Sequence, residues 1–572
     1  MKSKGGLFPF QLLWVIPTAA LLTLALGVWG WSSHHTRFDT ALYRSLALFE
    51  INNESYISGV GATDWRFLVA RWTGAGAVIT SLLALAALLH EQLATALARW
   101  TKQAVVVIGH AERAAGAFEA ARHLKRTALW IGAPAFGTAG FSAIALEWPA
   151  GERTRTVAAH AGGADHVLVA ERNDADALAL ARAARKAAPA AQITLLMNDT
   201  HLADEVAVTL NDAKTRVMSV ASVAARALHT AHPPFLIAQS EGHARVHALI
   251  VGFGAIGQAI LQDLIVNCRT TSLGLPRVVV IDPAAKALEG VLRVEAPELD
   301  RCAECVFIDG EIGQGAVRPE PAQIGAAISA GGPLTTACIC LGDDAAALST
   351  AAILQSLLRG VDVAQPPIFV RLREAGVLSL APDERSGGLR ALTPFGDIQA
   401  VLTASEFLAE EPDAAARAYH DGYRASLPLE RTNDPASRAW DDLDETYRQA
   451  SRRAVKHIPA MLTSGGIELD LKAVGLPRAP ADRSLFSDAA ELEQLAELEH
   501  ERWCAERRMD GWRATSLGEK QDKVRRLHPD LRPYGELPHQ TQEYDRVNVR
   551  TTQSICAREA ARPGKRARRG KH

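Results

Sequence analysis

The stretch His247-Ala-Leu-Ile-Val-Gly-Phe-Gly-Ala-Ile-Gly257 decides the fold class of this chain. Its apolar run, Ala248 to Val251, is typical of a strand buried on both faces of a parallel sheet. Three glycines with the spacing G-x-G-x-x-G follow, and a helical pattern comes after them: Gly252, Gly254 and Gly257. In such a loop the glycines permit a tight turn, close backbone approach to a phosphate, and close packing of the helix on the strand.

The next strand strengthens this interpretation. The run Arg277-Val-Val-Val-Ile-Asp282 ends in an acid, and a dinucleotide-binding fold places its ribose-binding carboxylate about 20 residues beyond its glycines. Strand, glycines, helix, strand and acid together predict a nucleotide site at Gly252, Gly254, Gly257 and Asp282. Since an acid at this position favours an unphosphorylated ribose, we expect the cofactor to be NAD or another adenine nucleotide rather than NADP.

Strands alternate with helices in two successive segments, residues 101–240 and 241–410, which implies parallel sheets covered on both faces. The first segment lacks the phosphate loop, because the glycine after Gly109 comes only at Gly116 and Gly132 stands where a ribose acid is expected. We therefore predict an α/β protein with tandem Rossmann-like domains, of which the second binds a nucleotide. The strands expected are 104–109, 128–131, 166–170 and 192–197, and then 248–251, 277–281, 305–308, 336–340 and 367–370.

The strand ends Asp165-His-Val-Leu-Val-Ala170 and Ala337-Cys-Ile-Cys-Leu-Gly-Asp-Asp344 in these tandem units resemble the TrkA-N/RCK family, which regulates potassium transport. The resemblance implies a nucleotide in the cleft at the carboxyl ends of the strands. It also implies homo-oligomers, dimers or tetrameric rings, below a membrane pore. The three glycines and Asp282 match the nucleotide motif of the family, whereas its usual small C-terminal ligand domain is not evident.

The N-terminal segment, residues 1–100, contains two long apolar runs. Phe8 to Trp31 is long enough to cross a bilayer and carries tryptophans toward its end, and Trp72 to Leu89 is rich in Gly and Ala, as closely packed helices in lipid are. A signal peptide is the alternative for the first run, but no small-residue cleavage site follows it. We therefore expect two transmembrane helices, at about 8–31 and 72–89, in a multi-pass inner-membrane protein with cytoplasmic C-terminal domains.

The loop between these runs has the layout of a pore. Phe38 to Phe49 has apolar residues at helical spacing, and a short glycine stretch follows it: Gly59, Val60 and Gly61. A two-span cation channel has this layout, in which a short helix and a glycine loop lie between two spans. In such a channel the loop carbonyls replace the hydration shell of an ion. The potassium-filter sequence Thr-Val-Gly-Tyr-Gly is absent. The alternative is an amphipathic helix that lies on the outer surface.

Residues 411–555 form a predicted helical region that ends in a second resemblance. The motifs are Leu498-Glu-His-Glu-Arg-Trp-Cys-Ala-Glu-Arg-Arg-Met-Asp-Gly-Trp512, Leu527-His-Pro-Asp-Leu531, Pro533-Tyr534 and Tyr544-Asp-Arg-Val-Asn548. They resemble the RyR domain, the repeat named after the ryanodine receptor, over residues 440–552. In bacteria such a module follows TrkA-N-like domains.

Aromatic and polar side chains within these motifs suit a ligand. Flat indole faces stack on a base, and Arg pairs with phosphate, so the candidate ligand-binding residues are Glu501, Trp503, Arg508, Trp512 and His528. The alternative is that both tryptophans are core residues, because buried aromatics dominate small helical cores, and that the charged side chains form a solvated face.

The composition excludes some functions and leaves others open. The net charge is −2 with a pI near 6.8, so overall charge indicates no specific nucleic-acid partner. The basic tail, residues 556–572, is either a disordered solubilising end or a contact for anionic lipid or nucleic acid. Cys302 and Cys305 lack a second Cys or His pair at zinc spacing, so no metal site is expected.

The sequence therefore predicts a membrane-bound nucleotide-sensing regulator or ligand-gated ion channel of the potassium-transport type. Ligands in the Rossmann and RyR-like domains gate the membrane segment in this prediction. The alternative is an accessory regulatory subunit of a separate transporter. A membrane-anchored NAD-dependent enzyme fits less well, because no proton donor or catalytic cluster stands out, and fold alone does not imply hydride transfer. We therefore expect no enzymatic activity.

Overall fold

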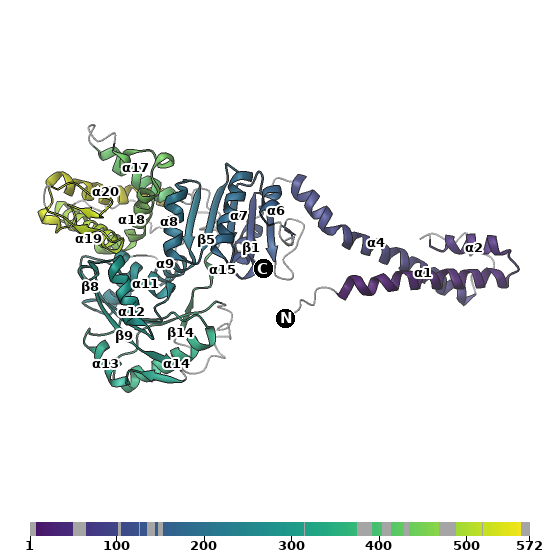
Figure 1. Ribbon diagram of the computed structural model, residues 1–572, viewed down its shortest axis with the longest axis horizontal. Coiled ribbons are helices and arrows are strands. Elements are labelled where there is room, and N and C mark those ends of the chain that lie inside the picture. The colour runs from purple at the N-terminus through teal and green to yellow at the C-terminus, as the bar shows by residue number, and fades with distance from the viewer. Residues whose placement is uncertain are drawn as a thin grey trace. The chain divides into compact units, whose positions relative to one another are not determined.

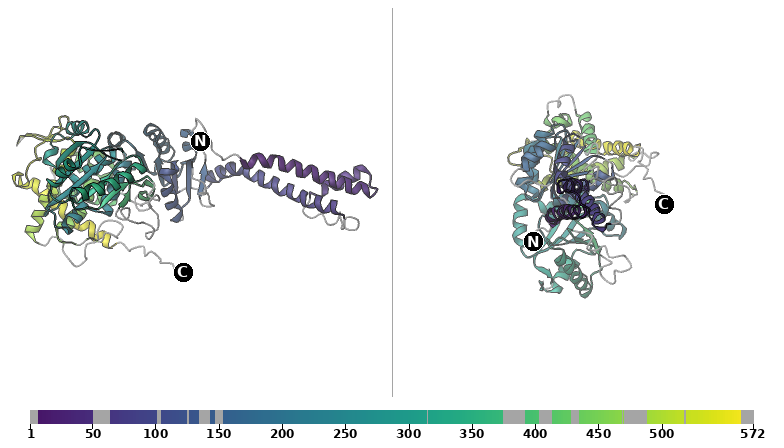
Figure 2. Two further views of the ribbon diagram at one scale, coloured as in Figure 1. Left: turned by 90° about the horizontal axis from the view of Figure 1, so that it is seen from below. Right: turned by 90° about the vertical axis from the view of Figure 1, so that its right-hand side faces the viewer.

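The computed structural model describes residues 7–49, 64–100, 104–124, 126–133, 143–146, 153–313, 315–373, 392–402, 413–427, 434–467, 469, 488–516 and 519–561. The chain divides into two compact units, Met1–Lys102 and Gln103–His572 (Figures 1 and 2). The candidate pore residues Gly59, Val60 and Gly61 lie outside the described residues, and so does the basic tail from residue 562 onward.

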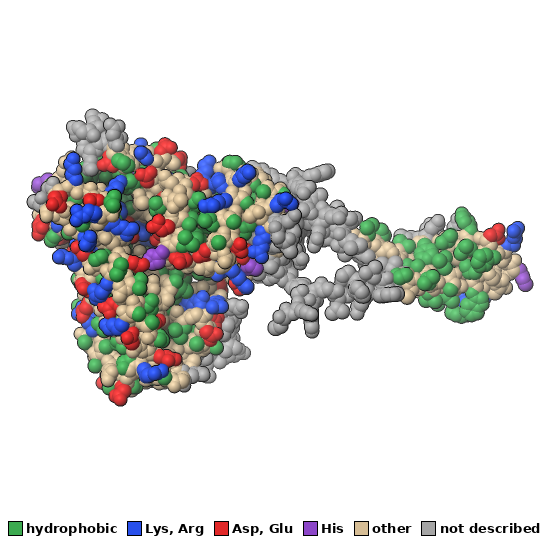
Figure 3. Space-filling view, in the orientation of Figure 1, with side chains coloured by type: hydrophobic (Ala, Val, Ile, Leu, Met, Phe, Trp, Pro, Cys, Tyr) green, Lys and Arg blue, Asp and Glu red, His purple; other side chains and the backbone are tan. Residues whose placement is uncertain are grey.

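The first unit consists of helices, in which α1 (Leu7–Ser33) packs against α2 (Phe38–Ala47) and α4 (Trp65–Trp100). Trp31 and Phe67 pack with their ring centroids 4.7 Å apart, and the hydroxyls of Thr23 and Thr73 lie 2.8 Å apart. A Cβ on Gly30 would come within 2.8 Å of the Phe67 ring, so a glycine is needed for this close packing. Hydrophobic side chains gather on the visible surface of this unit (Figure 3).

Within the described residues, no helix combines the length and the apolar character that crossing a bilayer requires. The prediction of transmembrane helices at 8–31 and 72–89 is therefore wrong. A span needs about 20 consecutive, mostly apolar residues. The described part of α4 instead begins with Arg66 and Arg71, and Arg66 is ion-paired with Asp64 at 2.6 Å. Polar groups also meet within the two runs, since the hydroxyls of Thr23 and Thr73 lie 2.8 Å apart.

The first sheet of the second unit has six parallel strands in the order β3-β2-β1-β4-β5-β6. This order places a switch point between β1 and β4. Of these strands, the sequence had predicted all but β3 and β6. The strands are β1 (Val105–His110), β2 (Ala128–Ala133), β3 (Ala143–Leu146), β4 (His166–Ala170), β5 (Gln192–Met197) and β6 (Thr215–Ser219), and the helices are α5 (Ala111–His123), α6 (Arg153–His160), α7 (Asp174–Ala187), α8 (Thr200–Leu210) and α9 (Val220–Ala231).

The second sheet repeats the same parallel order, β14-β13-β12-β7-β8-β9, with its switch point between β7 and β12. A hairpin, β10 (Glu311–Gly313) and β11 (Ala316–Arg318), follows β9. The strands are β7 (Arg245–Val251), β8 (Gly274–Asp282), β9 (Glu304–Asp309), β12 (Thr336–Ile339), β13 (Ile368–Arg371) and β14 (Leu392–Phe395), and the helices are α10 (Pro234–Ser240), α11 (Ala255–Asn267), α12 (Ala285–Glu295), α13 (Pro321–Ser329) and α14 (Asp344–Gly360).

The two sheet domains pack against each other, and the chain passes from the first to the second and back. Helix α9 of the first packs against α11 of the second, and the chain crosses back after β14. There α15 (Ile398–Val401) packs on α5 and α9, with Ile398 and Leu402 buried in the core of the first sheet (Figure 1).

The C-terminal module contains α17 (Ala414–Ser426), α18 (Glu445–Ser464), α19 (Ala489–Met509) and α20 (His539–Ala561), with the short strands β15 (Arg513–Ala514) and β16 (Leu527–His528). Helix α18 contacts α8 and α11, and α19 contacts α11 and the turn η1 (Leu299–Arg301). The module therefore touches both sheet domains, and α11 lies where the three parts meet (Figure 1).

Candidate functional site

The predicted glycine loop is present between β7 and α11. Gly252 has a φ of +91°, which L side chains rarely adopt, and a Cβ on Gly257 would lie 2.3 Å from the Gly252 carbonyl oxygen. Gly254 is different, since a Cβ there would meet no atom within 4 Å, and its φ is −70°. Because Gly254 is also the N-cap of α11 and no side chain caps that helix, the loop presents backbone N–H groups beside open space.

Asp282 lies at the end of β8, as predicted, but its carboxylate supports the glycine loop. Oδ2 accepts a hydrogen bond from the Phe253 N–H (2.8 Å), and Oδ1 accepts one from the Ala284 N–H (2.9 Å). A carboxylate has about four lone-pair sites, so two remain for a ribose hydroxyl. The acid therefore fixes the loop and keeps capacity for a ligand.

A cavity of about 460 Å³ lies at the switch point of the second sheet. Gly252 lines it, whereas Gly254, Gly257 and Asp282 do not. The hairpin β10–β11 forms another wall, anchored by the Thr350 hydroxyl, which donates to the Ile312 carbonyl oxygen (2.6 Å). Polar side chains of the lining that the sequence analysis had not identified are Glu311, Asp343, Ser349 and Thr350.

The corresponding place in the first sheet is occupied by side chains. Arg113, near the start of α5, donates to the Glu171 carbonyl oxygen and to Asn198 Oδ1, both at 2.8 Å. The Glu171 carboxylate is buried and pairs with His110 Nε2 at 2.9 Å. The His110–Glu171 pair therefore joins the ends of β1 and β4 at the switch point, and Arg113 joins the ends of β4 and β5. This arrangement agrees with the missing phosphate loop in this half.

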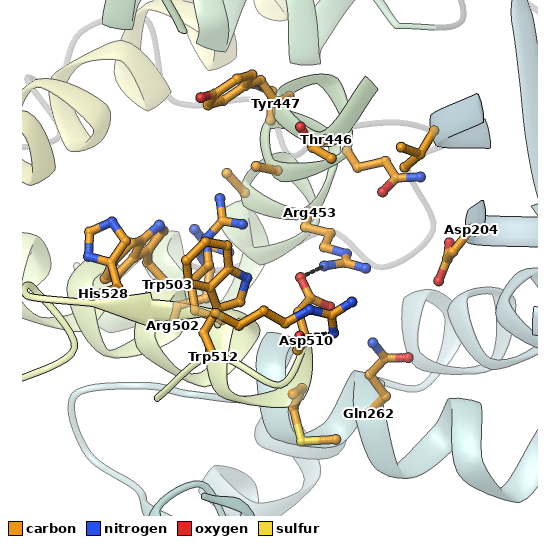
Figure 4. Close-up of a pocket in the computed structure, with 18 of the residues that line it drawn as sticks. Asp204, Gln262, Thr446, Tyr447, Arg453, Arg502, Trp503, Asp510, Trp512 and His528 are labelled. Carbon is orange, nitrogen blue, oxygen red and sulfur yellow. Dashed lines mark hydrogen bonds and ion pairs between the residues drawn. The ribbon is translucent and has the colours of Figure 1, made fainter. Parts of the chain in front are cut away.

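A larger cavity, of about 1140 Å³, lies where the module meets both sheet domains. Helix α8 contributes Asp204, α11 contributes Gln262, and α18 contributes Thr446 and Tyr447 to its lining. The module also supplies three of the predicted ligand-binding residues, Trp503, Trp512 and His528, which Figure 4 shows on one side of the cavity.

The three rings form one aromatic cluster. The His528 ring lies with its centroid 4.9 Å from that of Trp503 and 6.0 Å from that of Trp512, edge to face in both cases. The guanidinium carbon of Arg507 lies 5.9 Å from each indole centroid. All three rings are partly buried, so the alternative of a fully enclosed tryptophan core does not describe this cluster. A stacking surface with a cation beside it results.

Burial, together with the positive charges of Arg507 and His500, lowers the pKa of His528 to about 4. The ring is therefore neutral at neutral pH. Its Nδ1 accepts a hydrogen bond from the Asp530 N–H (3.1 Å), which leaves the remaining proton on Nε2. His528 can thus donate a hydrogen bond without adding charge to the cluster.

Buried ion pairs hold the wall behind the cluster in place. Arg502 donates to Glu499 Oε2 at 2.9 Å and to Glu506 Oε2 at 2.5 Å, and all three side chains are almost fully buried. Arg453 pairs with Asp510 at 2.7 Å and extends this network to α18 (Figure 4). Breaking such a buried pair costs several kcal/mol, about 3–5, so α18 and α19 form a rigid support for the tryptophans.

A basic turn borders the same cavity and was not identified from the sequence. Its cations are Lys520, Lys523 and Arg526. The Asp522 carboxylate accepts hydrogen bonds from the Val524 and Arg525 N–H groups (3.0 and 2.9 Å), which fixes the turn. This side of the cavity therefore combines aromatic faces with cations, the two features that a base and a phosphate require, while the lining also carries acids such as Asp204 and Asp510.

Two predicted ligand-binding residues lie elsewhere. Arg508 Nε donates to Glu298 Oε2 at 3.0 Å, and Glu501 faces Arg269 at 3.7 Å, so both lie where the module docks on the second sheet domain. Neither lines the large cavity. In the structure they join domains, and they are not placed to contact a ligand in the cavity.

No cluster of three or more His, Cys, Asp or Glu side chains suited to a metal occurs among the described residues. Burial raises the pKa of Cys302 to about 11 and that of Cys305 to about 12, so both thiols are protonated at neutral pH.

Comparison with known proteins identifies the C-terminal module. Residues 485–558 match the family model of the RyR domain, so the chain carries an RyR domain there and this resemblance is confirmed. No curated protein matches the chain.

Solved structures give more distant likenesses. One is "GsuK channel bound to NAD", with 12% identity, coverage of 71% of this chain and 85% of that chain, and a TM-score of 0.36. Another is "Crystal structure of the GsuK bound to ADP", with 13% identity, 69% and 94% coverage, and a TM-score of 0.32. A dipicolinate synthase structure from Bacillus halodurans matches at 11% identity, 54% and 99% coverage, and a TM-score of 0.21. Likenesses at these scores do not establish a common overall fold.

Proposed function

We propose that residues 103–572 form a nucleotide sensor with two ligand sites, one in the large cavity and one at the glycine loop of the second sheet. The observation that carries this proposal is the gathering of Trp503, Trp512, Arg507 and His528 on one side of a cavity that a basic turn also borders. Stacking of a base on an aromatic side chain contributes about 1–3 kcal/mol. Lys and Arg side chains bind the phosphate.

The second site takes NAD or another adenine nucleotide. Its support is the backbone of the glycine loop, the open space at Gly254, and the cavity at the switch point of the sheet. In open α/β sheets, ligands bind in the crevice outside the carboxyl ends of the strands at this point. Asp282 favours the unphosphorylated ribose with its two remaining lone-pair sites.

The two sites share one helix. Gly254 caps α11, and farther along the same helix Gln258 and Gln262 line the large cavity. The helix also packs against α18 and α19. A ligand that binds one arrangement of α11 and α19 more tightly than another shifts the balance between them, and only such a ligand does.

The regulated process in this proposal is potassium transport, which the TrkA-N/RCK resemblance implies. The chain acts there as a homo-oligomeric regulator, itself part of a channel or accessory to a separate transporter, and not as an enzyme. Two measurements check these points. Potassium flux in liposomes with and without ligand tests the transport role, and a nicotinamide turnover assay tests the absence of enzymatic activity.

The sensor itself is tested by calorimetry of the full-length chain against a panel of nucleotides. We expect Trp503→Ala and Trp512→Ala each to weaken binding in the large cavity about 10-fold or more, since each removes a stacking surface. Trp72→Ala is the matched control, because Trp72 lies in the first unit and is 72% exposed. Equal affinity of the wild type and both tryptophan variants for every nucleotide would refute the proposal for this cavity.

A further inference from the structure

Tyr423, Tyr447 and Tyr544, on other helices than Trp503, also line the large cavity, and Tyr447 lies beside the basic turn. Figure 4 shows Tyr447 of α18 and Thr446 apart from Trp503, Trp512 and His528. Lys523 lies beside Tyr447, with Nζ 3.3 Å from the phenolic oxygen and 5.5 Å from the ring centroid. We call Trp503, Trp512 and His528 the tryptophan station and Tyr447 the tyrosine station.

The basic turn connects the two stations. Its two ends are closed by backbone hydrogen bonds that Asp522 and Leu527 exchange, at 3.0 and 2.8 Å. Lys523, at one end, reaches the tyrosine station. Arg526, at the other end, donates to the Asp510 carbonyl oxygen at 2.7 Å, two residues before Trp512. One cation therefore lies toward each station, with the turn between them.

The size of the cavity fits a ligand larger than a mononucleotide. Pockets for single drug-sized ligands fall in the range of roughly 300–1,000 Å³. This cavity, at about 1140 Å³, lies above that range. A second aromatic surface suits a ligand that carries a second flat group.

We propose that the cavity binds a ligand with two nucleobases joined through phosphate, one base on the tryptophan station, the other on Tyr447, and the linking phosphate at Lys523 and Arg526. This inference rests on the proposed function of the cavity as a nucleotide site and names the class of nucleotide. Every base has a π-face, so two stacking surfaces select for the number of bases before they select for their identity.

The test compares adenosine monophosphate (AMP) with the linear dinucleotide pApA by calorimetry on the full-length chain. Asp282→Asn is the background, because it weakens the glycine-loop site of the second sheet and adds no atoms beside the large cavity. We expect pApA to bind at least about 10-fold more tightly than AMP, the gain from one additional stacked base. A pApA analogue with its second base removed should lose this gain, and it does so without any change to the protein.

Variants then assign the two stations. Tyr447→Ala should weaken pApA about 10-fold and leave AMP unchanged, Tyr447→Phe should keep the gain, and Trp503→Ala should weaken both ligands. Tyr43→Ala is the control, since Tyr43 is 67% exposed in the first unit. Equal affinities for AMP, pApA and the abasic analogue would overturn the two-base inference and leave a nucleotide site standing. Absence of binding by all three would overturn both the inference and the proposed function of the cavity.

Discussion

The two six-stranded sheets of the second unit share one strand order but differ in the crevice at the switch point. In each, a glycine with positive φ lies at the end of the central strand or directly after it, Gly109 in β1 and Gly252 after β7, and a Cβ on either would be crowded by the chain at the end of the neighbouring strand. The third residue of the following helix differs between the two sheets. It is Arg113 in α5 and Gly257 in α11.

The difference shows how a nucleotide-type fold loses its ligand and remains folded. The guanidinium of Arg113 is held by two oxygens of the same domain, which follow β4 and β5. The first sheet then serves as a support, and its α8 forms a wall of the large cavity. No side chain caps the start of α5 or of α11, so the two crevices differ in the side chains that fill the first one.

The largest expected effect comes from closing the open crevice. Gly254→Val should weaken NAD binding at least about 100-fold, or about 2.7 kcal/mol, because the branched side chain fills the space that a phosphate needs at the loop. The fold should persist, because a Cβ at Gly254 meets no atom within 4 Å and the residue has an ordinary φ. NAD titration and thermal unfolding measure the two quantities. The matched control is Gly290→Ala, which also meets no neighbour within 4 Å and should leave NAD binding unchanged.

The second prediction removes the side chain that fills the first crevice. Arg113→Ala should lower the free energy of unfolding by about 2 kcal/mol, because it leaves the Glu171 carbonyl and Asn198 Oδ1 without their charged donor. It should create no second NAD site, since Gly132 supplies no ribose acid. Denaturant unfolding and the binding stoichiometry check both statements. Arg122→Ala, which removes only a surface pair with Glu119, should change stability by no more than about 0.5 kcal/mol. A doubled NAD stoichiometry in Arg113→Ala would show that the arginine alone excludes the ligand.

The sequence predicted the open crevice of the second sheet but not the filled crevice of the first. The glycine spacing identified the open loop, because its backbone conformation needs those residues. Arg113 gave no signal, since a cation in the first turn of a helix has no fixed partner until the fold brings Glu171 and Asn198 to it. Strands β3 and β6 were missed for a related reason. Each is short, and β6 has only Val217 and Met218 as large apolar residues.

The cavity of the module shows the same limit. Trp503, Trp512 and His528 were predicted from the RyR resemblance, whereas Arg507 was passed over in favour of Arg508. Helical geometry could have distinguished the two, because a residue four positions after Trp503 lies only about 40° around the helix from it and the next one about 140°. No pattern in the sequence placed Tyr447 or the basic turn beside the tryptophans, since that contact joins separate helices and a loop.

The third prediction concerns the acid that the second sheet has and the first lacks. Asp282→Asn should weaken NAD binding about 10-fold and narrow the preference for NAD over NADP, because the negative charge that repels a ribose phosphate is lost. The new amide can still accept from the Phe253 N–H, so the glycine loop keeps this hydrogen bond. Parallel titrations with NAD and NADP measure the ratio. Asp309→Asn is the control, since Asp309 also ends a strand and accepts a backbone N–H, from Lys286. An unchanged ratio in Asp282→Asn would remove this acid from ribose recognition.

The smallest expected effect concerns the contacts by which each of the two sheet domains joins the module. The second does so through Glu298, which accepts from Arg508 and from the Ala514 N–H. The first does so through Asn211, whose Oδ1 accepts from the Glu445 N–H and from Arg448. Glu298→Gln should change the affinity of either site alone by less than about 3-fold. The glutamine keeps one acceptor oxygen but loses the charge facing Arg508, a difference of about 1 kcal/mol.

In this proposal only the second sheet binds NAD, so only its contact with the module can couple NAD binding to the large cavity. Glu298→Gln should therefore reduce the effect of NAD on nucleotide affinity in the large cavity. Asn211→Ala should lower stability and leave that coupling intact. Titrating the large cavity with a nucleotide at zero and at saturating NAD measures the coupling free energy in each variant, in both directions, since linkage makes it reciprocal. Loss of coupling in Asn211→Ala together with intact coupling in Glu298→Gln would reverse the roles of the two sheets, and would place the connection in the half whose own crevice is filled.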